Sequence, residues 1–319
     1  MQITSLLLIA AVLGFQSDNQ NSSDKRAPRK FELQYGAVIS ELPDDAMVRV
    51  WFPIPESNEL QTIKKTDSQA PAPIATAKDK KHGNAIGYFE KAQAKEIKFN
   101  VTYQVDRKEA YPGSMPGKLS EQEIARFLSA NQLVPTSGEP TKLLSDKKLA
   151  TDPMQLGQEL YEIVEAYMSY DKSKPGYGNG DVLWACSSKT GNCTDFHSLF
   201  ISLARNQNLP ARFEIGFPIG EKPSGNIKGY HCWAWFYTKT NGWIAVDISE
   251  ADKHPELKEY YFGRLTPDRV AFSTGRDIEL VPKPDSKPLN YFVYPHVEVD
   301  GKVWPKEKIK LQLSYKDIQ

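Results

Sequence analysis

The sequence predicts an α+β protein in which helices pack on an antiparallel sheet, preceded by a small β-sandwich and followed by short strands. Apolar residues alternate with period two between about residues 31 and 108, which indicates half-buried strands. From about residue 120 to 206 they recur with a helical period, and strand-like segments return after about residue 211. Helices that come before an antiparallel sheet are typical of an α+β core.

The chain of 319 residues exceeds one average domain, so we expect several segments with different roles. Residues 1–17 are expected to be a signal peptide or an N-terminal anchor, and residues 18–30 a polar linker. We expect a sandwich-like N-terminal domain over 31–110, the helix-and-sheet core over 118–265 and a C-terminal β extension over 266–319.

The N-terminal apolar stretch from Leu6 to Phe15 is too short to span a bilayer and fits the hydrophobic region of a signal peptide. No Lys or Arg precedes it, so a retained anchor or a buried strand stays open. We expect an exported protein, periplasmic or extracellular, with no integral membrane domain beyond such an anchor.

The charge balance excludes whole classes of partner. Lys+Arg and Asp+Glu each total 40, so the formal net charge is zero, and no basic stripe interrupts the sequence. Without a basic excess the chain lacks the electrostatic footprint of a nucleic-acid-binding protein. Anionic membrane surfaces are disfavoured for the same reason.

The strands of the first block follow from local patterns. The segments FELQYGAVI (31–39) and EIKFNVTYQV (96–105) each carry an apolar residue at every second position. AMVRVWFPIP (46–55) adds a third strand, which its prolines end. Residues 57–83 are rich in Pro, Ala and Lys and are expected to form a long loop.

The helices of the second block carry start signals. Ser120 with Glu123 matches a capping box, and Asp152 stands before Pro153 as an N-cap. DFHSLFISLARNQ (195–207) is a third helix. The strand-like segments ARFEIGF (211–217), YHCWAWFYT (230–238) and GWIAVDI (242–248) follow it.

Three cysteines, Cys186, Cys193 and Cys232, make an odd count, which indicates that at least one is kept for its chemistry. Cys186 and Cys232 could form a disulfide in an oxidising compartment and leave Cys193 free. Otherwise Cys232 is a core residue.

Cys193 lies at the start of the third helix, within GNCTDFHSLF (191–200). Unpaired N–H groups and the helix dipole stabilise a thiolate there. A cysteine nucleophile also needs a base and an orienting acceptor, and His231 and Asp247 lie on two strands of one predicted hairpin. If the hairpin loop holds an odd number of residues, both side chains share a sheet face, about one diagonal apart. A two-residue Asn-Gly turn would put them on opposite faces.

Each of these residues alone also has an ordinary structural explanation. A helix-start cysteine can be a small buried hydrophobe, a strand histidine a core residue and a strand-end aspartate a cap. A zinc site is a weaker alternative because its candidate ligands lack tight knuckle spacing; they are Cys186, Cys193, His197, His231 and Cys232. A glycan at Asn192 would block the cleft, and a non-enzymatic binding module stays open.

Together, GNCTDFHSLFISLARNQNLPARFEIGF, HCWAWFY and GWIAVDISEA resemble the core of the transglutaminase-like superfamily of papain-type cysteine enzymes, closest to its exported bacterial members. The resemblance covers roughly residues 150–265. It implies Cys193 as nucleophile, His231 as general base and acid, and Asp247 as orienter of the imidazole. Animal transglutaminases have Gln before the cysteine and Trp after it, where this chain has Asn192 and Thr194, so their crosslinking rules do not carry over.

The expected chemistry is acyl transfer from an amide of a protein or peptide substrate through a thioester, ending in hydrolysis or transamidation, with no cofactor and no metal. The oxyanion is expected to rest on the Cys193 N–H and the indole N–H of Trp184, with Tyr177 behind it. Asp195 and His197 are expected to support the site from behind.

Overall fold

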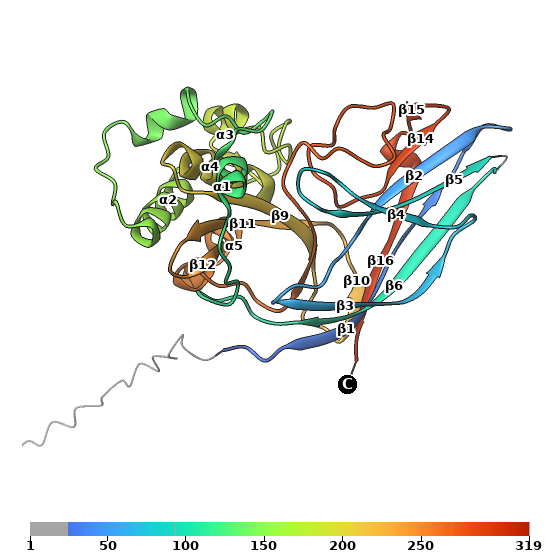
Figure 1. The fold of residues 1–319 in the computed structure, drawn as a ribbon, viewed down its shortest axis with the longest axis horizontal. Coiled ribbons are helices and arrows are strands. Elements are labelled where there is room, and N and C mark those ends of the chain that lie inside the picture. The colour runs from blue at the N-terminus through green and yellow to red at the C-terminus, as the bar shows by residue number, and fades with distance from the viewer. Residues whose placement is uncertain (1–24, 93, 319) are drawn as a thin grey trace, which may run out of the picture.

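The computed structural model describes residues 25–92 and 94–318. It contains a helix-covered sheet at one end and a two-sheet β-sandwich at the other (Figure 1). The α+β prediction is confirmed. The expectations for residues 1–17, and for most of the linker, concern residues outside the described part. No helix within that part is both long and apolar enough to cross a membrane.

The sandwich joins strands from both ends of the chain. One sheet has the order β10-β16-β1-β6-β3 and the other β15-β14-β2-β5-β4. Their bounds are β1 Arg29–Ile39, β2 Met47–Ile54, β3 Gln61–Gln69, β4 Ala75–Lys78, β5 Ala85–Ala92, β6 Ile97–Arg107, β10 Ser224–Asn226, β14 His296–Val299, β15 Lys302–Val303 and β16 Ile309–Asp317. The C-terminal strands thus complete both sheets that the N-terminal strands begin.

The period-two pattern places the core of the sandwich as expected. The alternating apolar residues of β1 and β6 are all buried: Phe31, Leu33, Tyr35, Ala37, Ile39, Ile97, Phe99, Val101, Tyr103 and Val105. The expectation of a long loop over 57–83 is wrong, because β3 and β4 lie there. Most of β3 is exposed at a sheet edge, so its side chains carry no apolar period.

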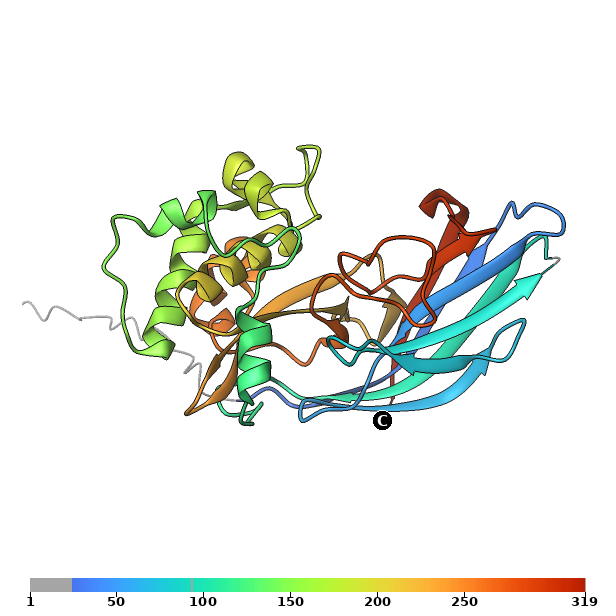
Figure 2. The same ribbon diagram turned by 45° about the horizontal axis from the view of Figure 1, so that its top comes forward.

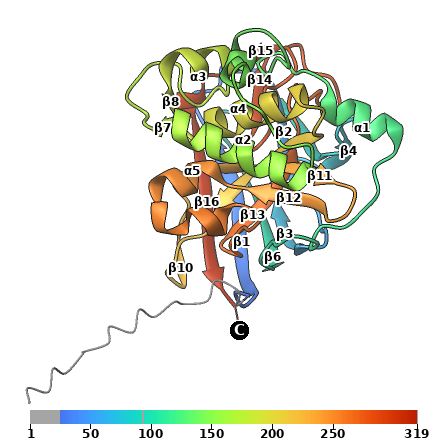
Figure 3. The same ribbon diagram turned by 90° about the vertical axis from the view of Figure 1, so that its left-hand side faces the viewer.

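The second half of the fold packs helices on a four-stranded antiparallel sheet of order β12-β11-β9-β13. The strands are β9 Ala211–Pro218, β11 His231–Thr238, β12 Gly242–Val246 and β13 Arg269–Thr274. The helices are α1 Glu121–Leu128, α2 Pro153–Tyr167, α3 Val182–Ser188, α4 Cys193–Asn206, α5 Ile248–Lys253 and α6 Lys258–Tyr261; β7 Ser169–Tyr170 pairs with β8 Thr190–Gly191. Figures 2 and 3 show α2, α3 and α4 together on one side of this sheet.

The predicted helix starts are confirmed. Ser120 and Glu123 form a reciprocal capping box at α1, and the Asp152 carboxylate caps α2 just before Pro153. Helix α4 is buried along almost its whole length and packs on β11 and β9. A helix this deeply buried holds its first residue, Cys193, in a fixed place above the sheet.

Candidate active site

The start of α4 is built to present a cysteine. Asn192 caps the helix by accepting from the Thr194 N–H at 2.8 Å, and the Asp195 carboxylate accepts from the Asn192 N–H at 2.9 Å. The backbone N–H of Cys193 has no hydrogen-bond acceptor among the described residues. Because the first N–H groups of a helix lack intrahelical acceptors, this donor is available to an anion beside the thiol.

The hairpin that carries His231 and Asp247 has a loop with an odd number of residues, which is the condition for the two side chains to share a sheet face. Three residues, Lys239, Thr240 and Asn241, lie between the paired Thr238 and Gly242. Extended by one position beyond the Ala234–Val246 pair, this register places Asp247 opposite Trp233 and one diagonal from His231, so both side chains share a sheet face.

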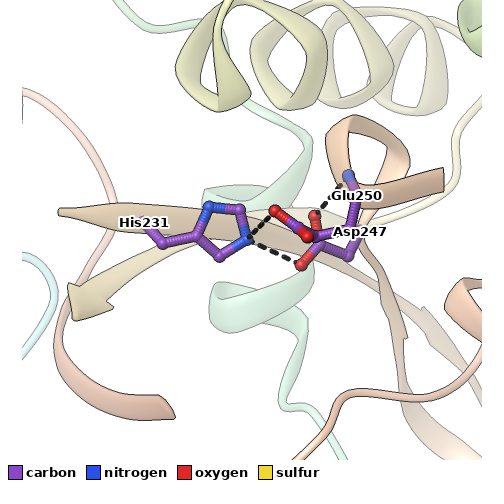
Figure 4. Close-up of side chains that lie close together, drawn as sticks. All are labelled: His231, Asp247 and Glu250. Atoms are coloured by element: carbon purple, nitrogen blue, oxygen red, sulfur yellow. Dashed lines mark hydrogen bonds and ion pairs between the residues drawn. The ribbon is translucent and has the colours of Figure 1, made fainter. Parts of the chain in front are cut away.

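His231 Nε2 donates to Asp247 Oδ2 at 2.7 Å, and Figure 4 shows this pair with Glu250 beside it. Glu250 Oε1 lies 3.8 Å from the same nitrogen. Since Nε2 is engaged by Asp247, Nδ1 is the ring nitrogen left for the Cys193 thiol. A base held by a carboxylate on one nitrogen, with the other free for the nucleophile, is the arrangement that nucleophilic catalysis requires.

A buried arginine holds the other side of this carboxylate. Arg269, the first residue of β13, donates from Nη1 to Asp247 Oδ2 at 2.8 Å. Burial acts to raise the pKa of Asp247, but the charges of His231 and Arg269 hold it well below its usual range. Asp247 is therefore a carboxylate throughout the neutral range, fully buried yet paired with two cations.

The thiol and the imidazole shift each other's protonation. Burial acts to raise the pKa of Cys193, but hydrogen bonds from Cys232 and His231 and the His231 charge hold it well below its usual value. Burial acts to lower the pKa of His231, and the Asp247 charge and hydrogen bond, with the contact to Cys193, raise it to about 10. At neutral pH the pair is a thiolate beside an imidazolium, which is the reactive form of a catalytic cysteine.

His197 lies behind the site and is neutral. Its Nε2 accepts from the Ile248 N–H at 3.0 Å, and its Nδ1 lies 3.7 Å from Cys232 Sγ. Complete burial lowers the pKa of His197 to about 4. Helix α4 is buried on every side at this turn, so the His197 ring does not face solvent. His197 instead fixes the backbone just after Asp247.

Asp195 fastens a loop to the start of α4. Its carboxylate accepts from the N–H groups of Gly178 and Gly180 at 2.7 and 2.9 Å, besides that of Asn192. Gly178 adopts φ +85°, a left-handed conformation that favours glycine. Asp195 thus does more than compensate the helix dipole: it positions one wall of the cleft.

The structure does not support Trp184 as an oxyanion donor. Its Nε1–H donates to the Pro175 carbonyl at 3.1 Å, and its ring packs against Gly176 at the back of the loop. Trp184 is also absent from the walls of the cleft that holds Cys193, whereas Tyr177 and Asn192 line it.

All three cysteines are free and buried, so the disulfide between Cys186 and Cys232 is not formed. The candidate zinc ligands do not form a metal-binding set either: in the described part of the chain, the side chains placed to share an ion are His231, Asp247 and Glu250, of which His231 alone was a candidate. Arg269 and Lys253 already neutralise those two carboxylates, which disfavours a cation there.

A cleft of about 540 Å³ opens over Cys193. Its lining residues are Tyr170, Lys172, Gly176, Tyr177, Gly178, Asn179, Asn192, Cys193, Gly229, Tyr230, Tyr291, Tyr294 and Lys306. A larger groove of about 820 Å³ runs along α2 and carries none of the residues of the site. The cleft, and not that groove, is where a substrate would meet the thiolate.

Sequence reasoning missed several of these residues. Tyr230 lies next to His231, and its hydroxyl accepts from Asn192 Nδ2 at 3.1 Å and lies 2.9 Å from Thr194 Oγ1. Arg269 lies just beyond residues 150–265, over which the sequence resemblance extends, and Tyr291 and Tyr294 come from the C-terminal segment. No local periodicity marks any of them, since they reach the site through tertiary packing.

The helix-covered antiparallel sheet has the arrangement of a transglutaminase-like core. Residues 142–248 match the family described as Transglutaminase-like superfamily, so this part of the chain is similar to that superfamily, in line with its sequence resemblance. The match supports a cysteine-dependent enzyme in general.

Individual relatives are distant. An uncharacterized protein of Haemophilus influenzae is 26% identical over 320 residues, covering 85% of this chain and 86% of that protein. The crystal structure of a candidate cysteine protease from Cytophaga hutchinsonii is similar in fold, with a TM-score of 0.62, 14% identity and 93% coverage of both chains. The periplasmic domain of TgpA from Pseudomonas aeruginosa matches at a TM-score of 0.41 with 14% identity, over 73% of this chain and 91% of that one.

Proposed function

We propose that this protein is an exported enzyme that transfers the acyl group of a peptide or protein amide through a thioester on Cys193. The observation that carries the proposal is the pair of hydrogen-bonded partners around Asp247, His231 at 2.7 Å and Arg269 at 2.8 Å, behind a thiol whose pKa is held low. Together they provide a nucleophile, a proton donor and a fixed orienting group.

In the first step the Cys193 thiolate forms a bond to the amide carbonyl carbon, and the carbonyl π electrons move onto oxygen. The imidazolium of His231 gives its proton to the leaving nitrogen as the C–N bond breaks, which leaves a thioester and a free amine. Neutral His231 then takes a proton from water or from an amine, which attacks the thioester and releases the thiolate. Hydrolysis and transamidation thus share every residue and differ in the acceptor.

The oxyanion of the tetrahedral intermediate needs at least two donors. The Cys193 N–H is one, because it has no acceptor among the described residues. We propose the Asn192 amide as the second: Asn192 lines the cleft, and its Nδ2 carries another N–H besides the one donated to Tyr230. Its capping bond to Thr194 fixes the amide so that Nδ2, not Oδ1, is the free end.

The test is mass spectrometry of the wild type and a Cys193→Ala variant, each incubated with a glutamine-containing peptide library with and without a primary amine. Peptide cleavage or ammonia loss that requires Cys193 supports hydrolysis, and amine incorporation supports transamidation. Iodoacetamide should modify Cys193 quickly at pH 6, where an ordinary thiol is protonated. Slow alkylation together with no Cys193-dependent product would favour the binding-module alternative instead.

Export is tested separately, by sequencing the N-terminus of the protein purified from its host. Cleavage after the Leu6–Phe15 stretch, in a periplasmic or extracellular fraction, is the expected result. An intact N-terminus in the cytoplasmic fraction would contradict it.

A further inference from the structure

Apart from the Cys193 thiolate itself, the charged side chains that line the cleft are all positive. Among the described residues that line it, Lys172 and Lys306 are cationic, and none is Asp or Glu. Both lysines are exposed, and neither makes an ion pair within residues 25–92 and 94–318. Two unneutralised ammonium groups in a cleft with low-dielectric walls attract anionic groups from solution.

The catalytic machinery does not offset this field. Its cations, His231 and Arg269, are matched by the anions Cys193 and Asp247, so the four groups sum to zero. Of the nearby carboxylates, Glu250 is engaged by Lys253, and buried Asp195 interacts with the charge of buried Arg276. The charge that a substrate meets on entering the cleft is therefore that of the two lysines.

The lysines come from different halves of the molecule. Lys172 follows β7 in the helical half, with its Nζ 5.6 Å from the centre of the Tyr170 ring. Lys306 begins a short 3₁₀ helix, Lys306–Lys308, between two strands of the sandwich. An extended ligand that crosses the cleft would meet a cation from each half.

The rest of the lining suits a peptide rather than a small amide. Five tyrosines contribute rings and hydroxyl groups: Tyr170, Tyr177, Tyr230, Tyr291 and Tyr294. Tyrosine offers large contact area and a hydrogen-bonding end at low entropic cost, which fits a peptide backbone and aliphatic stems. Three glycines in the lining, Gly176, Gly178 and Gly229, leave backbone open along the walls.

We propose that the acyl donor of this enzyme is an acidic peptide, one that carries carboxylates close to the scissile amide and meets Lys172 and Lys306 with them. The inference rests on the proposed acyl-transfer function and adds the substrate class. The reaction is the one already described; the lysines bind and orient, and neither takes part in bond formation.

The first experiment measures kcat/KM on three matched peptides that differ only in whether Glu, Gln or Lys flanks the reactive amide. The wild type should prefer Glu over Gln by about five- to tenfold at low salt, and 1 M NaCl should largely remove the preference. Lys172→Met and Lys306→Met should each reduce the Glu/Gln ratio about two- to fivefold. Lys306→Glu should move the preference toward the Lys peptide, and Lys65→Met, an exposed lysine outside the cleft, should leave the ratio unchanged.

The second experiment does not depend on turnover. Cys193 is alkylated with anionic iodoacetate and with neutral iodoacetamide; in both, the thiolate displaces iodide from carbon. The iodoacetate/iodoacetamide rate ratio should fall two- to fivefold in each cleft variant and stay constant in Lys65→Met. Equal rates on Glu and Gln peptides, or ratios that the cleft variants do not move, would overturn the acidic-peptide proposal. A charge-dependent alkylation ratio without turnover of any peptide would instead count against the acyl-transfer proposal alone.

Discussion

The two sides of Asp247 hold two buried histidines in different protonation states: His231 is cationic and His197 is neutral. On the cleft side, His231 lies 2.7 Å from Oδ2, and its pKa is raised to about 10. On the inner side, His197 Nε2 lies 3.7 Å from Oδ1 and accepts from a backbone N–H, and its pKa is lowered to about 4. Both rings are at least nine-tenths buried, so burial alone does not decide protonation.

The difference follows from the hydrogen bond that each ring makes. A short bond to a carboxylate favours the charged imidazole, whereas a ring nitrogen that accepts from a peptide N–H must be unprotonated. Asp247 therefore keeps His231 protonated on the cleft side, whereas His197 on the inner side stays neutral and supports the backbone.

The largest effect is expected for Asp247→Asn. The amide cannot supply the charge that raises the pKa of His231, so kcat should fall by about 10²- to 10⁴-fold. The alkaline limb of the kcat/KM profile, expected near pH 10 in the wild type, should move to lower pH. If the alkaline limb stayed at the same pH, the pKa of His231 would not depend on the charge of Asp247.

Arg269→Gln should have the next largest effect. Without the guanidinium the buried carboxylate loses a partner that orients it, so kcat should fall about tenfold with little change in KM. Stopped-flow alkylation of Cys193 over a range of pH should show a thiolate that forms at higher pH than in the wild type. A lower kcat accompanied by a lower free energy of unfolding, with no change in the pH profile of Cys193 alkylation, would assign Arg269 a role in folding alone.

His197→Gln tests the inner side and should affect stability more than activity. The free energy of unfolding of the wild type should fall as the pH drops from 6.5 toward 4, because the unfolded chain binds a proton that buried His197 refuses. The loss from this group reaches about 3 kcal/mol. Gln has no such titration, so the two unfolding free energies, measured with urea, should converge toward low pH; a constant gap would contradict neutral His197.

The smallest effect is expected for Glu250→Gln. Its carboxylate is 3.8 Å from His231 Nε2 and partly exposed, so solvent screens its contribution. We expect less than a threefold change in kcat and a slight move of the alkaline limb to lower pH. A loss as large as that of Asp247→Asn would reverse the assignment of the orienting carboxylate.

Sequence alone predicts those features of the site that local rules control. The caps of α1 and α2 follow from a few neighbouring residues, and the diagonal relation of His231 and Asp247 follows from strand pairing once the loop length is odd. The α+β class follows from apolar periodicity in the same way.

The errors have a common physical origin. Trp184 was a reasonable donor by spacing, but the packing of loop 175–180 turns its N–H toward Pro175. Arg269 reaches Asp247 from another strand, and no apolar period marks a buried arginine. β3 escaped detection because an exposed edge strand does not need apolar residues.

The ordering of the strands has a consequence for biosynthesis. β1 lies between β6 and β16, with Phe31 opposite Asp317, so the first strand described is completed by the last, and the C-terminus lies beside it (Figure 1). Tyr291, Tyr294 and Lys306, which wall the cleft, also belong to the final part of the chain. A ribosome-bound chain can thus carry Cys193, His231 and Asp247 and still lack the C-terminal side chains that wall the cleft.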